Sequence, residues 1–281
     1  MERLSRAEIE EAMRYHHPEK TLATLPGEHE IRDETLAPFF GTDAGTYREI
    51  RDGFAERARR CARELLEDAR FARLVDGLPF EPGATVVGLG DSITDDYQSW
   101  FEILRHLLAG RRSDEGVRLV NMGISGDTTS GLLGRILDVL EEEPDWMIVL
   151  IGTNDAAFVR DPPTKSLVSP EETAKNLRAL RDLIEARSSA RLVWMTPPPA
   201  IEARLAGEDP RQPVWRNAGL AEVVRLVREI AGEDPLVDLW KAFGDPAEPD
   251  FLLPDGLHPS LAGQKAIAAA LVERLGREGP G

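Results

Sequence analysis

The spacing of the hydrophobic positions changes at about residue 81. Before that point, apolar residues recur every three or four positions, which is typical of amphipathic helices. One helix is expected to begin at Ser5, and a long second one to run from Thr46 to about Gly77. Both starts have the capping-box spacing, in which Glu follows a Ser or Thr three residues later. The stretch from Thr21 to Gly45 is rich in Pro, Gly and polar residues and is expected to be irregular.

After that point, short apolar runs alternate with helical patterns. The runs predict five strands, at residues 85–89, 117–122, 146–151, 192–195 and 236–239. Helices are expected at residues 97–108, 130–142, 170–187, 214–231 and 260–275. The third run is apolar almost throughout, as in a parallel sheet that is covered on both faces. The alternation indicates right-handed βαβ units, so we expect a parallel sheet between two layers of helices, with functional residues on loops at the carboxyl ends of the strands.

This change of pattern predicts the domain organisation. Residues 1–80 are expected to form a helical N-terminal extension, residues 81–277 the α/β domain, and residues 278–281 a disordered tail. The extension carries no recognisable site, and a lid, a brace on the main domain and an oligomer contact all stay open as its role. It contains His16, His17 and His29, but no cysteine or carboxylate set with ligand spacing surrounds them, so no metal site is predicted.

The charge balance narrows the range of partners. The 281 residues include 50 acidic and 34 basic side chains, a formal net charge of −16. Nucleic acids and anionic membranes are bound by basic surfaces, so neither is expected as a partner. The single cysteine, Cys61, excludes an internal disulfide, the N-terminus lacks the apolar core of a signal peptide, and no later run approaches a membrane span. A cytoplasmic location is therefore expected.

A serine and a histidine stand in positions that suit acyl transfer. Ser92 belongs to Gly-Asp-Ser directly after the first strand, although such a turn serves equally well as a helix cap. His258 stands three residues after Asp255 on a loop bracketed by prolines. A carboxylate at that spacing can bind Nδ1 of the imidazole and leave Nε2 to accept the serine proton.

Two further loops carry hydrogen-bond donors. Gly126 follows the second strand, where the lack of a side chain lets a backbone amide approach a substrate oxygen; a plain turn explains it as well. Asn154, in Gly-Thr-Asn-Asp after the third strand, has a side-chain amide that can donate to a developing oxyanion; the alternative is an Asx turn.

Taken together and in this order, the four segments resemble the SGNH or GDSL-type hydrolase family over residues 81–277. The resemblance implies a three-layer α/β/α sandwich with a five-stranded parallel sheet in the flavodoxin-like order 2-1-3-4-5, and no cofactor. It implies Ser92 as the nucleophile and as one oxyanion donor through its amide. Gly126 and Asn154 would be the other donors, and Asp255 and His258 would complete the triad. The N-terminal 80 residues lie outside the family's core and could reshape the substrate pocket.

The function expected from these residues is hydrolysis of a small-molecule ester through an acyl-enzyme. An O-deacetylase of an acetylated carbohydrate or small natural product would use the same residues. A catalytically silent binding protein on the same fold is the alternative from another class. A nucleotide binder is disfavoured because Asp91, Asp95 and Asp96 would repel phosphate. Five aromatic residues near strand ends are candidates either for the pocket or for core packing: Trp100, Phe158, Trp194, Trp215 and Phe251.

Overall fold

The fold is built on one parallel sheet. The computed structural model describes residues 4–22, 31–159, 165–205 and 213–277, so the expected tail at 278–281 lies outside the described residues. The strands are Thr85–Gly90 (β1), Arg118–Gly123 (β2), Trp146–Leu150 (β3), Arg191–Met195 (β4) and Leu236–Val237 (β5). They pair in parallel in the order β2-β1-β3-β4-β5, which confirms the expected sheet order.

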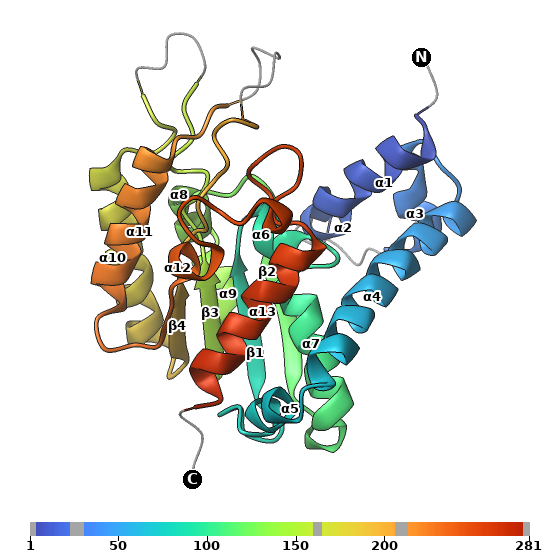
Figure 1. Ribbon diagram of the computed structural model, residues 1–281, viewed down its shortest axis with the longest axis horizontal. Helices are drawn as coiled ribbons and strands as arrows, with labels where there is room; N and C mark the ends of the chain where they lie inside the picture. The colour runs from blue at the N-terminus through green and yellow to red at the C-terminus, as the bar shows by residue number, and fades with distance from the viewer. Residues whose placement is uncertain (1–3, 23–30, 160–164, 206–212, 278–281) are drawn as a thin grey trace.

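Helices cover both faces of the sheet, as Figure 1 shows, which confirms the three-layer fold. One face packs against α7 (Trp100–Arg111), α12 (Leu239–Phe243) and α13 (Leu261–Leu275). The other packs against α8 (Thr129–Gly134), α9 (Ile136–Leu140), α10 (Pro170–Arg187) and α11 (Asn217–Ala231). Side chains alternate along each strand, so that Val86 belongs to the first core and Val87 to the second. The central strand β3 is apolar and buried throughout because both cores exclude water, whereas the edge strand β2 is only partly buried.

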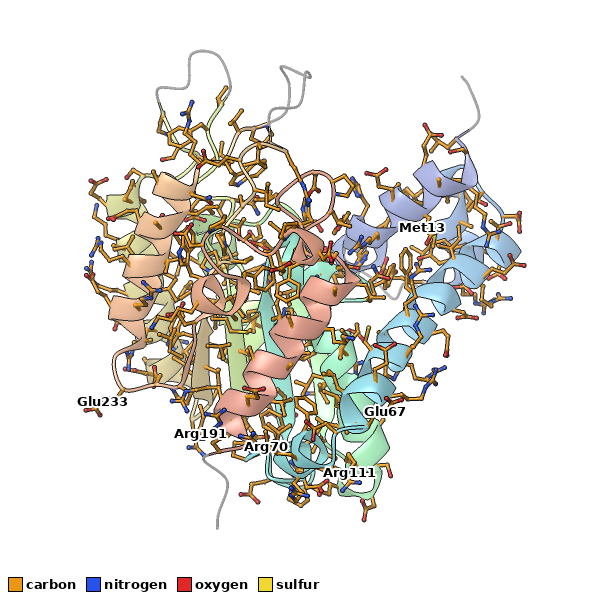
Figure 2. The ribbon with its side chains drawn as sticks, viewed as in Figure 1. Met13, Glu67, Arg70, Arg111, Arg191 and Glu233 are labelled. Atoms are coloured by element: carbon orange, nitrogen blue, oxygen red, sulfur yellow. The ribbon has the colours of Figure 1, made fainter. Side chains whose placement is uncertain are left out.

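The N-terminal helices pack beside the first of these two layers (Figure 1). They are α1 (Arg6–Tyr15), α2 (Pro18–Leu22), α3 (Asp33–Leu36), α4 (Ala44–Leu66) and α5 (Ala69–Asp76), with a 3-10 turn, η1 (Ala37–Phe40), before α4. Met13 on α1, labelled in Figure 2, is fully buried in a third apolar cluster. The other members come from α1, α3, η1 and α4: Ile9, Leu36, Ala37, Phe40, Tyr47, Ile50 and Phe54.

The structure corrects several expected helix boundaries in this region. The capping box of Ser5 and Glu8 is confirmed, but the long helix begins at Ala44, because the Asp43 side chain accepts a hydrogen bond from the Thr46 amide at 3.0 Å. The single helix expected up to Gly77 is two helices. The first ends at Leu66, and Asp68 caps α5 by accepting from the amides of the next turn. The stretch expected to be irregular contains α3 and η1, and its residues 23–30 lie outside the described ones.

Shorter corrections apply to the α/β part. The helix expected at 130–142 is divided into α8 and α9 at Arg135, whose side chain instead reaches back to pair with Asp127 at 2.8 Å. The helix expected from residue 97 begins at Trp100, because a separate turn of helix, α6 (Ser92–Asp95), directly follows β1. A turn of 3-10 helix, η2 (Ser113–Glu115), precedes β2. No helix in the described parts of the chain is long and apolar enough to cross a membrane.

Candidate active site

Ser92 stands at the first position of α6, where the chain leaves the carboxyl end of β1. The helix is capped by Asp91, whose Oδ1 accepts a hydrogen bond from the Ile93 amide at 3.0 Å. Asp91 is fully buried, and burial raises its pKa to about 7 against the opposing effect of that amide. The cap fixes the direction in which the chain turns away from the sheet, and Ser92 lines a cavity there.

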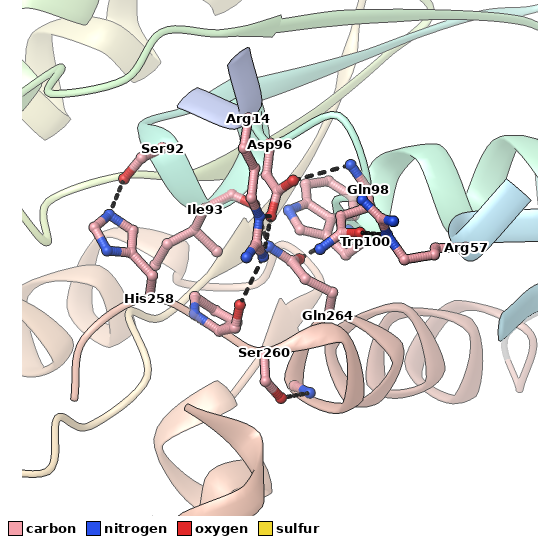
Figure 3. A network of polar contacts seen from close by, with 12 residues as sticks. Arg14, Arg57, Ser92, Ile93, Asp96, Gln98, Trp100, His258, Ser260 and Gln264 are labelled. Carbon is pink, nitrogen blue, oxygen red and sulfur yellow. Dashed lines mark hydrogen bonds and ion pairs between the residues drawn. The ribbon is translucent and has the colours of Figure 1, made fainter. Parts of the chain in front are cut away.

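His258 and Asp255 complete a hydrogen-bonded series with Ser92. The Ser92 Oγ lies 3.0 Å from Nε2 of His258 (Figure 3), and Nδ1 of His258 lies 2.7 Å from Oδ2 of Asp255. Because a carboxylate only accepts, Nδ1 carries the proton and Nε2 is free to accept one from the hydroxyl. Burial raises the pKa of Asp255, but the hydrogen bond and charge of His258 outweigh this, so the pKa lies below its ordinary value of 3.8.

A tyrosine of the N-terminal segment lies on the histidine. The ring of Tyr15 packs against the imidazole of His258, with 4.8 Å between the ring centroids. Tyr15 is the last residue of α1, more than 240 positions away in the chain by its number. A contact over that separation leaves no local signal in the sequence, and the sequence pattern did not predict it.

Asn154 lies on the loop after β3 with one side-chain hydrogen committed. Its Nδ2 donates to the carbonyl of Asp127 at 2.9 Å, and because an amide group carries two hydrogens, the second is left for a ligand. The neighbouring Asp155 is fully buried and accepts from the Thr129 amide and from the Thr173 hydroxyl, each at 2.9 Å. These buried contacts hold the asparagine loop against α8 and α10.

Gly126 lies on the loop after β2 in a conformation that suits glycine. Its φ is +82°, which other residues adopt only with strain, and an added Cβ would meet nothing within 4 Å. The residue before it, Ser125, is anchored by its backbone amide and hydroxyl to the buried Asp95 at 2.8 and 2.9 Å. The Gly126 amide is thus on an open turn whose position is set by its neighbours.

These loops and the N-terminal helix α1 line one open cavity of about 730 Å³. The five residues predicted for the site all line it: Ser92, Gly126, Asn154, Asp255 and His258. Part of the wall is one face of α1, with residues at helical spacing: Glu8, Glu11, Ala12 and Tyr15. The other lining residues are His16, Ser125, Arg204, Leu205, Pro213, Trp215 and Leu257.

Of the five aromatic candidates, Trp215 lines the cavity. Its Nε1 donates to the carbonyl of Thr153 at 2.9 Å, which fixes the indole beside the asparagine loop. Trp100 and Trp194 are buried in the two cores, with 0% and 1% exposure. Phe158 and Phe251 do not contribute to the lining described above. Core packing therefore explains both buried tryptophans.

The three N-terminal histidines do not form one site. His16 lines the cavity, His17 lies 2.8 Å from Asp95 through Nδ1, and His29 lies outside the described residues. Over the described ranges of the chain, no group of three or more His, Cys, Asp or Glu side chains is placed to hold a metal ion.

Comparison with known proteins matches this chain to a family of hydrolases. The model of the GDSL-like Lipase/Acylhydrolase family matches residues 89–266. An acetylxylan esterase of Geobacillus stearothermophilus is 29% identical over 70% of this chain and 95% of its own length. The esterase TesA of Pseudomonas aeruginosa is 40% identical over 65% of this chain and 83% of its own.

Solved structures show the same likeness. LAE5, an alpha/beta hydrolase enzyme from the metagenome of Lake Arreo, is 30% identical with a TM-score of 0.59, covering 71% of this chain and 98% of that protein. A catalytic mutant of the Geobacillus stearothermophilus acetylxylan esterase Axe2 is 27% identical with a TM-score of 0.57, covering 70% and 95%.

Proposed function

The chain belongs to the GDSL-like lipase/acylhydrolase family, and we propose that it hydrolyses small-molecule carboxylic esters through an acyl-enzyme formed on Ser92. The observation that carries this proposal is the series of hydrogen bonds from Ser92 through His258 to Asp255, at 3.0 and 2.7 Å. The series opens into the cavity that Gly126 and Asn154 also line. A nucleophile, its base, the group that orients the base and two oxyanion donors therefore face one space.

In the first half of the reaction, Nε2 of His258 takes the hydroxyl proton of Ser92 while Oγ attacks the acyl carbon. The carbonyl oxygen becomes an oxyanion, to which the amides of Ser92 and Gly126 and the second side-chain hydrogen of Asn154 donate. Asp255 stabilises the imidazolium formed in this step. The bond to the leaving oxygen then breaks, His258 gives that oxygen its proton, and the alcohol departs from the acylated serine.

Water completes the reaction by the same route. Nε2 of His258 takes a proton from a water molecule, whose oxygen attacks the acyl carbon. The oxyanion forms again at the same donors and collapses as the bond to Oγ of Ser92 breaks. His258 returns its proton to Oγ, and the carboxylic acid leaves.

The test is hydrolysis of p-nitrophenyl acetate by the full chain and by Ser92→Ala. We expect the variant to lose several decades in kcat, because no other group of the site replaces the nucleophile. Ser113→Ala is the matched control, since Ser113 is exposed on η2, next to the amino end of β2 and away from the site. Activity of Ser92→Ala close to that of the control would refute the proposal.

An O-deacetylase of an acetylated carbohydrate is the second candidate. It is favoured by the acetylxylan esterase among the relatives, which aligns over 95% of its own length. The proposal is tested by comparing acetate release from acetylated xylo-oligosaccharides with hydrolysis of p-nitrophenyl esters of short and long acyl chains. Carbohydrate acetates cleaved with the highest kcat/KM would support a deacetylase, and a preference for long acyl chains would exclude it.

The same panel decides the alternative of a silent binding protein. A wild-type chain that hydrolyses none of these esters, yet binds an ester in the cavity, would favour that alternative over catalysis.

A further inference from the structure

The segment Arg14–Lys20, which joins the end of α1 to α2, lies against the loops of the site. Arg14 donates from Nε and Nη2 to Oδ2 of Asp96, at 2.8 and 2.6 Å (Figure 3). Its Nη2 also donates to the carbonyl of Pro259 at 3.2 Å. Asp96 directly follows α6 and is fully buried, and Pro259 follows His258. One arginine thus ties the segment that carries the serine to the loop that carries the histidine.

The same segment reaches the loop after β2 that carries Gly126, called the glycine loop below, through a buried carboxylate. Asp95 is 3% exposed, and its Oδ1 accepts from Nδ1 of His17 at 2.8 Å and from Nζ of Lys20 at 2.5 Å. Its Oδ2 accepts from the amide and the hydroxyl of Ser125 at 2.8 and 2.9 Å. Asp95 therefore transmits the position of the N-terminal segment to the residue that precedes Gly126.

Lys20 also binds this loop directly. Its Nζ donates to the carbonyl of Gly123, the last residue of β2, at 2.7 Å. The ammonium thus fixes one end of the stretch from Gly123 to Ser125, and Asp95 fixes the other. Gly126 has no side chain of its own to pack, so the place of its amide depends on these anchors.

Lys20 is not needed to hold α1 in place. Ile9 and Met13 on α1 are buried in the third apolar cluster, and burial of each such side chain contributes about 1.5–3 kcal/mol. Glu10 on the same helix pairs with Arg57 of α4 at 2.7 Å. Loss of the Lys20 ammonium therefore leaves the docking of α1 intact. It removes the direct contact between Lys20 and the glycine loop.

We propose that Lys20 is a positioning residue for the oxyanion hole, which sets the place of the Gly126 amide through Asp95 and the Gly123 carbonyl. The inference rests on the function proposed above and deepens it, because it assigns the N-terminal segment to the catalytic geometry. Three roles were open for the N-terminal extension: a lid, a brace on the main domain and an oligomer contact. A positioning role of Lys20 corresponds to the brace. A misplacement of about 1 Å in the catalytic geometry can cost roughly 100-fold in rate. Because an oxyanion donor acts on charge that develops in the transition state, the loss is expected in kcat.

The test compares Lys20→Met with wild type in the full chain. We expect kcat on p-nitrophenyl acetate to fall about 10- to 100-fold, with a much smaller change in KM. A second readout is the preference for an oxygen ester over the matched thionoester, in which sulfur replaces the carbonyl oxygen. Sulfur accepts hydrogen bonds weakly, so a misplaced donor lowers this preference, whereas a smaller folded fraction does not. Lys20→Arg should restore most of kcat and most of the preference for the oxygen ester.

Lys265→Met is the matched control. Lys265 on α13 binds Glu64 of α4 at 2.8 Å, so it also links an N-terminal helix to the α/β part, but it lies outside the lining of the cavity. We expect its kcat and ester preference to equal those of wild type. If Lys20→Met fails to fold, Lys20→Gln is measured against the same criteria.

The results separate this inference from the proposed function. Wild-type kcat and ester preference in Lys20→Met, or equal losses in Lys265→Met, would overturn the positioning role while Ser92→Ala remains inactive. An inactive wild type, or an active Ser92→Ala, would instead overturn the proposed function itself.

Discussion

Replacing Asp95 by Asn tests how the N-terminal segment is held to the site. Burial raises the pKa of Asp95, but the hydrogen bond from His17 and the charge of Lys20 outweigh it and lower the pKa from 3.8 to about 2. At about 1.4 kcal/mol per pKa unit, this difference is worth about 2–3 kcal/mol of unfolding free energy. The asparagine keeps an oxygen acceptor and nearly the same volume but loses the charge.

The sign of the pH dependence follows from the lowered pKa. The folded state holds the carboxylate ionised more strongly than the unfolded chain does, so its contribution is complete above about pH 4 and is lost as the pH falls towards 2. By about pH 3 roughly half of it should be gone. The assay is urea unfolding of wild type and Asp95→Asn from about pH 6 to pH 3, read as the difference between their unfolding free energies.

The difference between the two unfolding free energies is the useful quantity, because all of the chain's 50 acidic residues except Asp95 are present in both proteins. It should shrink by about 1 kcal/mol between pH 6 and pH 3. Asp114→Asn is the matched control, because it removes one carboxylate at an exposed position on η2, and its difference from wild type should stay level. If the difference in unfolding free energy between wild type and Asp95→Asn is equally constant with pH, the reasoning is refuted.

The remaining predictions concern the site and its loops. Asn154→Ala should lower kcat about 100- to 1000-fold on p-nitrophenyl acetate with little effect on the urea midpoint, because it removes one oxyanion donor; a loss under threefold would contradict that role. Asp255→Asn should lower kcat/KM by about 10²–10⁴-fold, since the amide no longer holds Nδ1 of His258 as a donor; a near wild-type value would exclude the orienting role. The wild-type kcat/KM should fall as the pH is lowered, because the proposed base accepts the serine proton only as a neutral imidazole, whereas the lowered pKa of Asp255 keeps that carboxylate ionised; a profile that stays flat down to about pH 5 would count against His258 as the base. Gly123→Ala should cost about 1–3 kcal/mol in urea unfolding, since the added Cβ would lie 2.6 Å from a backbone nitrogen, whereas Gly134→Ala has nothing within 4 Å and should be neutral or stabilising; equal effects would contradict the close approach at Gly123.

The site residues that the sequence predicts could be found because strand order and local spacing bring them together. Ser92, Gly126 and Asn154 each follow an apolar run, and the carboxyl ends of parallel strands meet at one edge of a sheet. Asp255 and His258 are close in the chain, so their spacing alone predicts a contact. Local pattern, a simple topology and the family resemblance predict that these five residues lie together, and all five line the cavity.

The parts that the sequence pattern does not predict depend on contacts between distant segments. Lys20 and Asp95 are 75 positions apart, and Tyr15 meets a residue near the other end of the chain. Helical periodicity shows which side of α1 is apolar, but not which neighbour covers the other side. The buried histidine His17 illustrates the same limit, since its partner is a carboxylate that follows Ser92 by three positions.

The end of the long N-terminal helix was missed for a different reason. Apolar residues continue at helical spacing across Asp68, so periodicity alone predicts one helix. The Asp68 side chain competes with the helix by accepting from two amides of the next turn, and this local bond divides α4 from α5.

The most direct test of the account is covalent labelling of the full chain with a fluorophosphonate, followed by mass mapping of the adduct. An activated serine attacks phosphorus, the bond to fluorine breaks as fluoride leaves, and the serine keeps the phosphonyl group, whereas an ordinary serine does not react. Ser125 lines the same cavity and serves as an internal comparison. The account predicts a single adduct on Ser92 that is absent from Ser92→Ala; an unlabelled protein, or an adduct on Ser125 instead, would contradict it.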